Sequence, residues 1–225
     1  MTLKACSVCV TGLALSSLAL ADVADYVLPP EPAFVIHRVT AKEELAARKA
    51  KTAILKHLFG ERAENVARFN RLDSRFVYAG RKLKVPDLPA GAVYSPMPVE
   101  YRPAIGQAKY VLIDLKRQFL GAYENGRLVA SYPISSGRYG YPTPAGDNQV
   151  TLKKRLHKSS LYPPPNGGWP MPWAVRFRGT QYWIHAGDLP GRPDSHGCIR
   201  LFPADAKAFY DWAEIGLPVR LVPSL

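Results

Sequence analysis

One stretch near the C-terminal end constrains this chain more than any other. It runs from Ile184 to Leu201 and reads I-H-A-G-D-L-P-G-R-P-D-S-H-G-C-I-R-L. Cys198 directly follows a glycine, and the histidines His185 and His196 precede it within the stretch. A thiolate is a strong nucleophile, but its formation near neutral pH needs a nearby imidazole or positive charge. The stretch therefore holds a candidate nucleophile and two candidate bases.

The glycine beside the cysteine adds a second functional feature. Gly197 allows a sharp backbone turn that brings amide N–H groups near the thiol. Such groups can form an oxyanion hole for the tetrahedral intermediate of an acyl transfer. A cysteine near a histidine is weak evidence by itself, because most free cysteines are small buried hydrophobic residues. On composition alone, a structural thiol in the core is the commoner case.

The whole pattern resembles the active-site signature of the L,D-transpeptidase family, whose catalytic domain is of the YkuD type. The resemblance rests on S-H-G-C-I-R, which ends at Arg200, and on I-H-x-G, whose histidine lies thirteen residues before the cysteine. A second match is the loop at residues 136–146, S-G-R-Y-G-Y-P-T-P-A-G, because family members carry G-x-x-x-x-x-T-P-x-G after a group of strands. The resemblance covers roughly residues 109–222.

The resemblance implies roles for the residues of the signature. Cys198 is the nucleophile and His185 is the base, and the backbone carbonyl of Ala186 orients the imidazole. We expect the backbone N–H groups of His196, Gly197 and Cys198 to form the oxyanion hole. We expect substrate contacts from a further set of side chains, which comprises Arg200, Ser195, Trp173 and Tyr182.

Several alternatives stay open. Arg200 either contacts a substrate carboxylate, steadies the loop or forms a structural ion pair, and His185 could be a core histidine at a strand end. The aromatic residues between Lys153 and Trp173 resemble the family's lid, but ordinary loop packing explains them as well. Zinc held by both histidines and the cysteine is a further alternative, since three ligands suffice for catalytic zinc. We expect neither a metal nor an organic cofactor.

The implied reaction is a two-step acyl transfer on peptidoglycan. Cys198 attacks the L–D peptide bond before the terminal D-Ala of a tetrapeptide stem, expels D-Ala, and yields its acyl group to an amine. That amine belongs to the diamino acid of another stem, to a lysine of a wall-anchored protein or to a free D-amino acid. Members of the family are typically acylated by carbapenems. With water as acceptor, the protein would be an L,D-carboxypeptidase or amidase; with a silent site, it would be a wall-binding module.

Residues 1–21 are predicted to be a secretory signal peptide. Lys4 supplies the positive charge, an uncharged and mainly apolar run follows, and Ala19-Leu20-Ala21 forms an A-x-A cleavage site. Cys6 and Cys9 leave with this segment, so Cys198 is the one thiol of the mature chain. A lone thiol in an oxidising compartment cannot form an internal disulfide. We expect a periplasmic protein, at the membrane only if the signal stays uncleaved.

The charge balance agrees with an anionic partner. The chain has 30 Lys and Arg against 18 Asp and Glu, a formal net charge of +12. Such a surface favours nucleic acid, membrane or cell-wall polymer. Export argues against nucleic acid, whereas peptidoglycan stems carry the free carboxylates that suit a basic cleft.

Residues 33–86 are predicted to form a small α+β module. The sequence predicts a strand over residues 35–39, a capping box at Thr40 and Glu43, a helix to about Leu58 that ends at Gly60, and a second helix over residues 62–69. The predicted helical apolar positions are Ala46, Ala50, Ala53, Ile54 and Leu58. The ending A-G-R-K-L-K-V-P resembles that of the LysM module, a βααβ fold that binds glycans, although the family's G-D-T-L opening is missing. A packing or spacer domain is the alternative.

The rest of the chain is predicted to be a proline-stiffened linker at residues 87–106 and a catalytic domain at residues 107–225. Strands are expected at residues 110–116, 118–124 and 127–133, near Gln149 and at 217–222, with a helix at residues 204–213. Asn125-Gly126 is typical of a type I′ hairpin turn, and residues 153–173 are expected to be irregular. The predicted fold class is therefore mainly β, a β-sandwich-like domain preceded by the α+β module.

Overall fold

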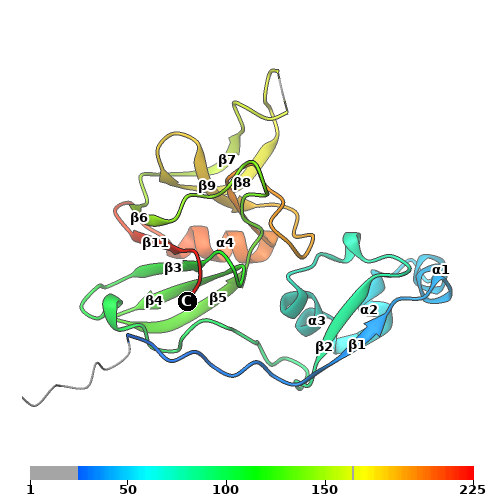
Figure 1. The fold of residues 1–225 in the computed structure, drawn as a ribbon. Coiled ribbons are helices and arrows are strands. Elements are labelled where there is room, and N and C mark those ends of the chain that lie inside the picture. Colours follow the sequence, from blue (N-terminus) through cyan, green and yellow to red (C-terminus); the bar gives the residue numbers. More distant parts are fainter. Residues whose placement is uncertain (1–24, 164) are drawn as a thin grey trace, which may run out of the picture.

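The computed structural model describes residues 25–163 and 165–225. The signal peptide predicted at residues 1–21 lies outside the described residues. Figure 1 shows a small module of helices with a two-stranded sheet at one end of the molecule, and two larger sheets at the other end. Within the two described ranges, no helix is long and apolar enough to cross a membrane.

The N-terminal module begins and ends with a β-strand, and these two strands pair with each other. β1 (Phe34–Arg38) pairs antiparallel with β2 (Lys82–Pro86). The capping box predicted before α1 (Ala41–Lys49) is confirmed, because the Glu43 amide donates to Thr40 Oγ1 over 3.2 Å and the Thr40 amide donates to Glu43 Oε2 over 2.7 Å. The order of elements agrees with a small α+β unit, and its resemblance to LysM stays a prediction.

The helix predicted to run to about Leu58 is two helices, and the continuous prediction is wrong. α1 ends at Lys49, Lys51 has a positive φ of 52°, and α2 (Ile54–Phe59) begins in a new direction. The break buries Ala47 with Ile54 and leaves Ala50 and Ala53 exposed, unlike the predicted apolar stripe. Gly60 ends α2 as predicted, and after a short 3-10 turn, η1 (Gly60–Arg62), α3 (Ala63–Asn70) follows. The 3-10 turn η2 (Ser74–Phe76) leads to β2.

Residues 87–106, predicted to be a linker, pack along the larger part of the molecule. Met97 and Ala104 are fully buried and Tyr101 nearly so, in one cluster with Phe119 and Tyr123 of the neighbouring sheet. The segment ends in a 3-10 turn, η3 (Arg102–Ala104), and the Tyr101 amide donates to the carbonyl of Gly126 over 2.8 Å. This segment is called the strap below.

The first large sheet has five strands in the order β5-β4-β3-β11-β6. The predicted hairpin of β4 (Phe119–Glu124) and β5 (Arg127–Pro133) is confirmed, and positive φ values of 47° at Asn125 and 81° at Gly126 fit the type I′ turn. The other strands are β3 (Tyr110–Asp114), β6 (Gly146–Gln149) and β11 (Pro218–Val222). β6 therefore ends at Gln149, where the sequence predicted a strand to start.

The second large sheet has four strands in the order β10-β9-β8-β7. They are β7 (Leu152–Lys158), β8 (Pro170–Arg178), β9 (Tyr182–Ala186) and β10 (Ile199–Leu201), and α4 (Pro203–Trp212) follows.

The prediction that residues 153–173 are irregular is wrong at both ends, where β7 pairs with β8. β7 is a basic edge strand without apolar alternation, a common way to protect a sheet edge. Pro170 and Pro172 lie in the first part of β8, which pairs with β7 but not with β9. One side of the strand is unpaired there, so a residue without a backbone N–H is tolerated. Between these two strands, the described residues 159–163 and 165–169 belong to no helix or strand, and residues 159–169 are called the lid loop below.

The main core lies between the two large sheets and α4. Val111 and Val219 from the five-stranded sheet, Val175 and Ile184 from the four-stranded sheet, and Phe209 from α4 are buried together in it. The predicted fold class is confirmed: the chain is mainly β, with a sandwich-like pair of sheets and a small α+β module before it. Ile184 of β9 and Ile199 and Leu201 of β10 are buried in this core, which fixes the two strands next to the site.

Candidate active site

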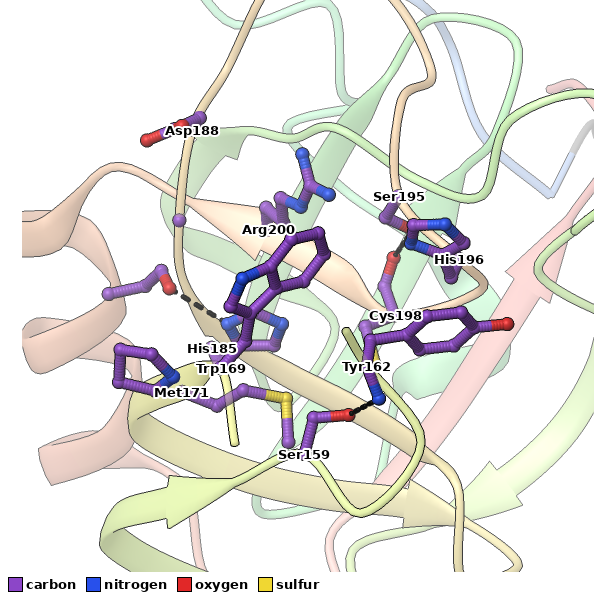
Figure 2. Close-up of a pocket in the computed structure, with 13 residues that line it drawn as sticks. Ser159, Tyr162, Trp169, Met171, His185, Asp188, Ser195, His196, Cys198 and Arg200 are labelled. Carbon is purple, nitrogen blue, oxygen red and sulfur yellow. Dashed lines mark hydrogen bonds between the residues drawn. The ribbon is translucent and has the colours of Figure 1, made fainter. Parts of the chain in front are cut away.

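The pairing of β9 with β10 brings the predicted nucleophile and base to one pocket. The strands are parallel, and Arg200 lies directly opposite His185. Cys198 lies directly before β10, two residues ahead of Arg200, and borders the same pocket as His185 and Arg200. Figure 2 shows Cys198, His185 and Arg200 around one pocket. The sheet register therefore assembles the chemical groups that the signature predicted.

His185 is held as a neutral base. Its ring is buried, and its Nδ1 lies 2.8 Å from the carbonyl oxygen of Ala186. Because a carbonyl only accepts, Nδ1 carries the hydrogen and Nε2 keeps a free lone pair. The pKa of His185 is lowered to about 4, mainly by burial and to a smaller extent by the charge of Arg200, whereas the bond to the Ala186 carbonyl opposes the shift. The bond to Ala186 is the one that the sequence predicted.

Cys198 rests as a thiol. Burial raises the pKa of its side chain, while the backbone of Trp183 and the charge of Arg200 oppose that shift. Its Sγ donates a weak hydrogen bond to the carbonyl of Gln181 over 3.5 Å. A neutral thiol and a neutral imidazole that line one pocket are suited to proton transfer at the moment of attack, rather than to a thiolate formed beforehand.

The turn before Cys198 is fixed by internal hydrogen bonds. The Ser195 hydroxyl donates to the Cys198 carbonyl over 2.5 Å and accepts from the Gly197 amide over 3.0 Å. Thr143 from the T-P-x-G loop donates to the Gly197 carbonyl over 2.8 Å. Ser195 is only 1% exposed and its hydroxyl is bonded within the turn, but the residue borders the pocket, so its predicted substrate contact stays a prediction.

Gly197 is required by the geometry of this turn. Its φ is 115°, and a Cβ at this position would lie 2.9 Å from Cε1 of Tyr182. Of the three amides predicted to form the oxyanion hole, that of Gly197 already donates to Ser195 Oγ. The amides of His196 and Cys198 are the remaining candidates for binding an oxyanion.

The side chain of His196 belongs to an aromatic cluster under the lid loop. Its ring stacks on Tyr162 with centroids 3.9 Å apart and meets the edge of Tyr141 at 4.9 Å. Its Nε2 lies 2.8 Å from a guanidinium nitrogen of Arg138, which can only donate. Burial and then Arg138 lower the pKa of His196, so the ring is neutral at neutral pH. Sequence reasoning assigned no role to this side chain.

The remaining predicted substrate residues lie in different places. Arg200 lines the pocket and reaches Asp194 only loosely, with its NH1 3.5 Å from Oδ2. Tyr182 lines a second cavity. Trp173 lines neither of these cavities and packs against Tyr210 with ring centroids 5.6 Å apart, so the structure does not bring it together with Cys198 and His185. Its position on β8 points it toward α4.

Two cavities meet at Cys198. One, of about 310 Å³, is lined by His185, Arg200 and Trp169; the other, of about 320 Å³, is lined by Tyr182 and reaches toward the T-P-x-G loop. Cys198, His196, Tyr162, Ser159 and Met171 border both. The lid loop thus separates two approaches to one thiol. Over residues 25–163 and 165–225, no three His, Cys, Asp or Glu side chains form a group that could hold a metal ion.

Comparisons with known proteins agree with this geometry. Residues 108–221 match the model of the YkuD family, described as the L,D-transpeptidase catalytic domain. A Mycobacterium tuberculosis protein named as an L,D-transpeptidase is 36% identical over 99 residues, or 39% of this chain. The match spans about a third of that relative's length, 36%. The YkuD protein of Bacillus licheniformis, also named as an L,D-transpeptidase, is 26% identical over 65% of this chain and 78% of its own length.

A solved structure extends the similarity beyond the catalytic domain. The crystal structure of an L,D-transpeptidase fragment from Xylanimonas cellulosilytica is 28% identical, with a TM-score of 0.52. The match covers 86% of this chain and 100% of that one.

Proposed function

The chain belongs to the L,D-transpeptidase family of YkuD-type catalytic domains, and from this premise we propose that it is a cysteine acyltransferase acting on the stem peptides of peptidoglycan. One observation carries the proposal. The neutral, oriented His185 of β9 and Cys198, directly before β10, border one pocket, and two cavities meet at the thiol.

The first step forms the acyl-enzyme. The Nε2 lone pair of His185 takes the thiol proton as Sγ of Cys198 attacks the carbonyl before the terminal D-Ala of a tetrapeptide stem. The amides of His196 and Cys198 stabilise the oxyanion. The intermediate collapses to a thioester, and the protonated Nε2 returns its proton to the departing amine of D-Ala.

The second step transfers the acyl group. An acceptor amine loses a proton to Nε2 of His185 and attacks the thioester, and Cys198 leaves as a thiol. Two cavities that meet at one sulfur provide separate places for the donor stem and the acceptor. The acceptor is the diamino acid of another stem, which gives a 3→3 crosslink, a lysine of a wall-anchored protein, or a free D-amino acid.

The proposal includes export to the periplasm. It is supported by the predicted signal peptide at residues 1–21, by the lone thiol of the mature chain and by the net charge of +12, which suits carboxylate-bearing stems.

The test is mass spectrometry of purified muropeptides after incubation with the enzyme, beside a Cys198→Ala control. Dimers that lack one D-Ala, or exchanged D-amino acids, are expected with the enzyme and not with the control. Trimmed stems alone would make the protein a hydrolase that uses water. No change with either protein would contradict the proposal and favour a binding function.

A further inference from the structure

The loop that joins His185 to Cys198 is held in two halves by different parts of the chain. The catalytic domain holds the second half: Ser135 Oγ donates to the carbonyl of Arg192 over 2.8 Å, and the Ser195 amide donates to Ser136 over 3.0 Å. The first half, residues 188–191, is held by the N-terminal module. The two parts of the chain therefore share one catalytic loop.

Three hydrogen bonds from the module reach the first half. The Asp73 amide donates to the carbonyl of Leu189 over 2.8 Å, and Arg81 donates to the carbonyl of Pro190 over 2.9 Å. Arg75 donates to Oδ1 of Asp188 over 2.7 Å. Leu189 is fully buried at this contact.

Asp73 of the module orients the Arg75 side chain for this contact. Asp73 accepts from Nε and NH2 of Arg75 at 3.2 and 2.7 Å, and from its backbone amide at 3.0 Å. These bonds hold the pKa of Asp73 below its usual value. Asp73 of the same module therefore holds the Arg75 guanidinium in the orientation that contacts Asp188. Figure 2 shows the Asp188 carboxyl group directed away from Cys198.

The loop is also shaped to approach the module closely. Gly191 has a φ of 82°, and a Cβ there would lie 2.8 Å from a guanidinium nitrogen of Arg81 and 3.2 Å from the carbonyl of Asn70. Only glycine fits this position without moving the loop or the module. This steric requirement is independent of the charge pairing.

The held segment begins two residues after the carbonyl that orients the base. Ala186 accepts from His185, the Gly187 amide donates to the Leu201 carbonyl over 2.9 Å, and Asp188 follows. We propose that Asp73, Arg75 and Arg81 of the N-terminal module are positioning residues of the catalytic site, which act through residues 188–191 on the Ala186 carbonyl and so on His185. This inference rests on the roles of Cys198 and His185 in the proposed function.

The test compares Arg75→Ala, Arg75→Lys and Asp188→Ala, alone and as the Arg75→Ala/Asp188→Ala double variant, in the full chain. Arg48→Ala is the matched control, because Arg48 is an exposed arginine of the same module and pairs only within α1. Three quantities are measured: kcat and KM for muropeptides, the rate of Cys198 alkylation by iodoacetamide against pH, and the melting temperature. His185→Ala gives the alkylation rate without the base.

We expect Arg75→Ala to lower kcat by about 10- to 100-fold with little change in KM or melting temperature, because small misplacements of catalytic groups are costly. Its alkylation rate near neutral pH should fall toward that of His185→Ala. Arg75→Lys should recover part of the loss. The double variant should be no worse than the poorer single one, since the two residues act through one contact. Arg48→Ala should match the wild type.

Unchanged kcat and alkylation in both Arg75→Ala and Asp188→Ala would overturn the inference. An equal loss of kcat in Arg48→Ala would also overturn the inference, because the effect would then come from a general destabilisation of the module. The alkylation readout needs no peptidoglycan. If the wild type fails to turn over muropeptides while Arg75→Ala still shifts the alkylation profile, the proposed function fails and the positioning role stands.

Discussion

His185 donates its Nδ1–H to the carbonyl oxygen of Ala186 over 2.8 Å, so the orientation of the proposed base depends on the residue that follows it in the chain. The bond also fixes the tautomer and leaves Nε2 as the basic nitrogen. The ring is kept neutral by its burial.

The buried His185 makes stability dependent on pH. Its pKa is about 4 in the folded chain and about 6.5 when unfolded. A lowered folded-state pKa contributes stability above pH ~6.5, which is lost as the pH falls toward 4, by up to about 3 kcal/mol. Urea unfolding should therefore show a steeper loss between pH ~7 and ~4 for the wild type than for His185→Gln. Equal losses in the two proteins would contradict this prediction.

Gly197→Ala should inactivate the enzyme while the fold persists. The positive φ of 115° and the contact of 2.9 Å with the Tyr182 ring cost about 1–2 kcal/mol or more of stability and shift the turn that carries the oxyanion amides. We expect muropeptide turnover to fall by at least about 100-fold. Gly216→Ala is the control, because Gly216 has a φ of 88° with open space around it, far from the thiol in sequence. Similar turnover in both variants would contradict the assigned role.

His196 should stabilise the lid loop more through the stacking of its ring on Tyr162 than through the hydrogen bond of that ring with Arg138. His196→Phe keeps the stacking on Tyr162, whereas His196→Ala removes it. An aromatic pair contributes about 0.5–1.5 kcal/mol, so KM should rise by about 2- to 10-fold in the alanine variant and less in the phenylalanine variant. Steady-state kinetics beside the exposed His57→Ala control measure this. Equal KM values for the two His196 variants would show that stacking is not the contribution that matters.

Arg68→Ala should destabilise the contact between the module and α4. Arg68 donates to both carboxylate oxygens of Asp205, at 3.0 and 2.9 Å, and to the Ser131 carbonyl at 2.9 Å. Both side chains are nearly buried, so removing one partner costs about 3–5 kcal/mol. Burial already raises the pKa of Asp205 against the opposing charge of Arg68, so protonation at low pH should reduce the loss. A loss below ~1 kcal/mol in chemical denaturation at neutral pH would contradict this.

The sequence could indicate the proposed catalytic pair, Cys198 and His185, because both members lie in one local pattern. His185 ends a strand, Cys198 precedes another, and the short loop between them limits how far apart they can lie. The hairpin at Asn125-Gly126 and the capping box at Thr40 were predictable for the same reason, since each depends on neighbours within a few residues.

Contacts between residues far apart in the sequence could not be predicted from such local patterns. Arg75 and Asp188 are 113 residues apart, and nothing local to either predicts their pairing. The substrate contact of Trp173 was expected from the family resemblance, whereas its packing against Tyr210 of α4 depends on the tertiary fold, which no local pattern predicts. The break at Lys51 was missed because the apolar spacing continued across it, while tertiary packing of Ile54 and Leu55 decided the direction of α2.

The strap determines where a catalytic fragment of this protein can begin. Met97, Tyr101 and Ala104 cover the outer face of the five-stranded sheet, and Tyr94 continues that cover with its ring at 6.4 Å from Phe119. A catalytic fragment cut at residue 107 would present Tyr110, Leu112, Phe119 and Tyr123 to water, an exposed apolar patch that invites aggregation. The smallest fragment that keeps the sheet covered therefore begins before Tyr94, inside the segment that links the module to the catalytic domain.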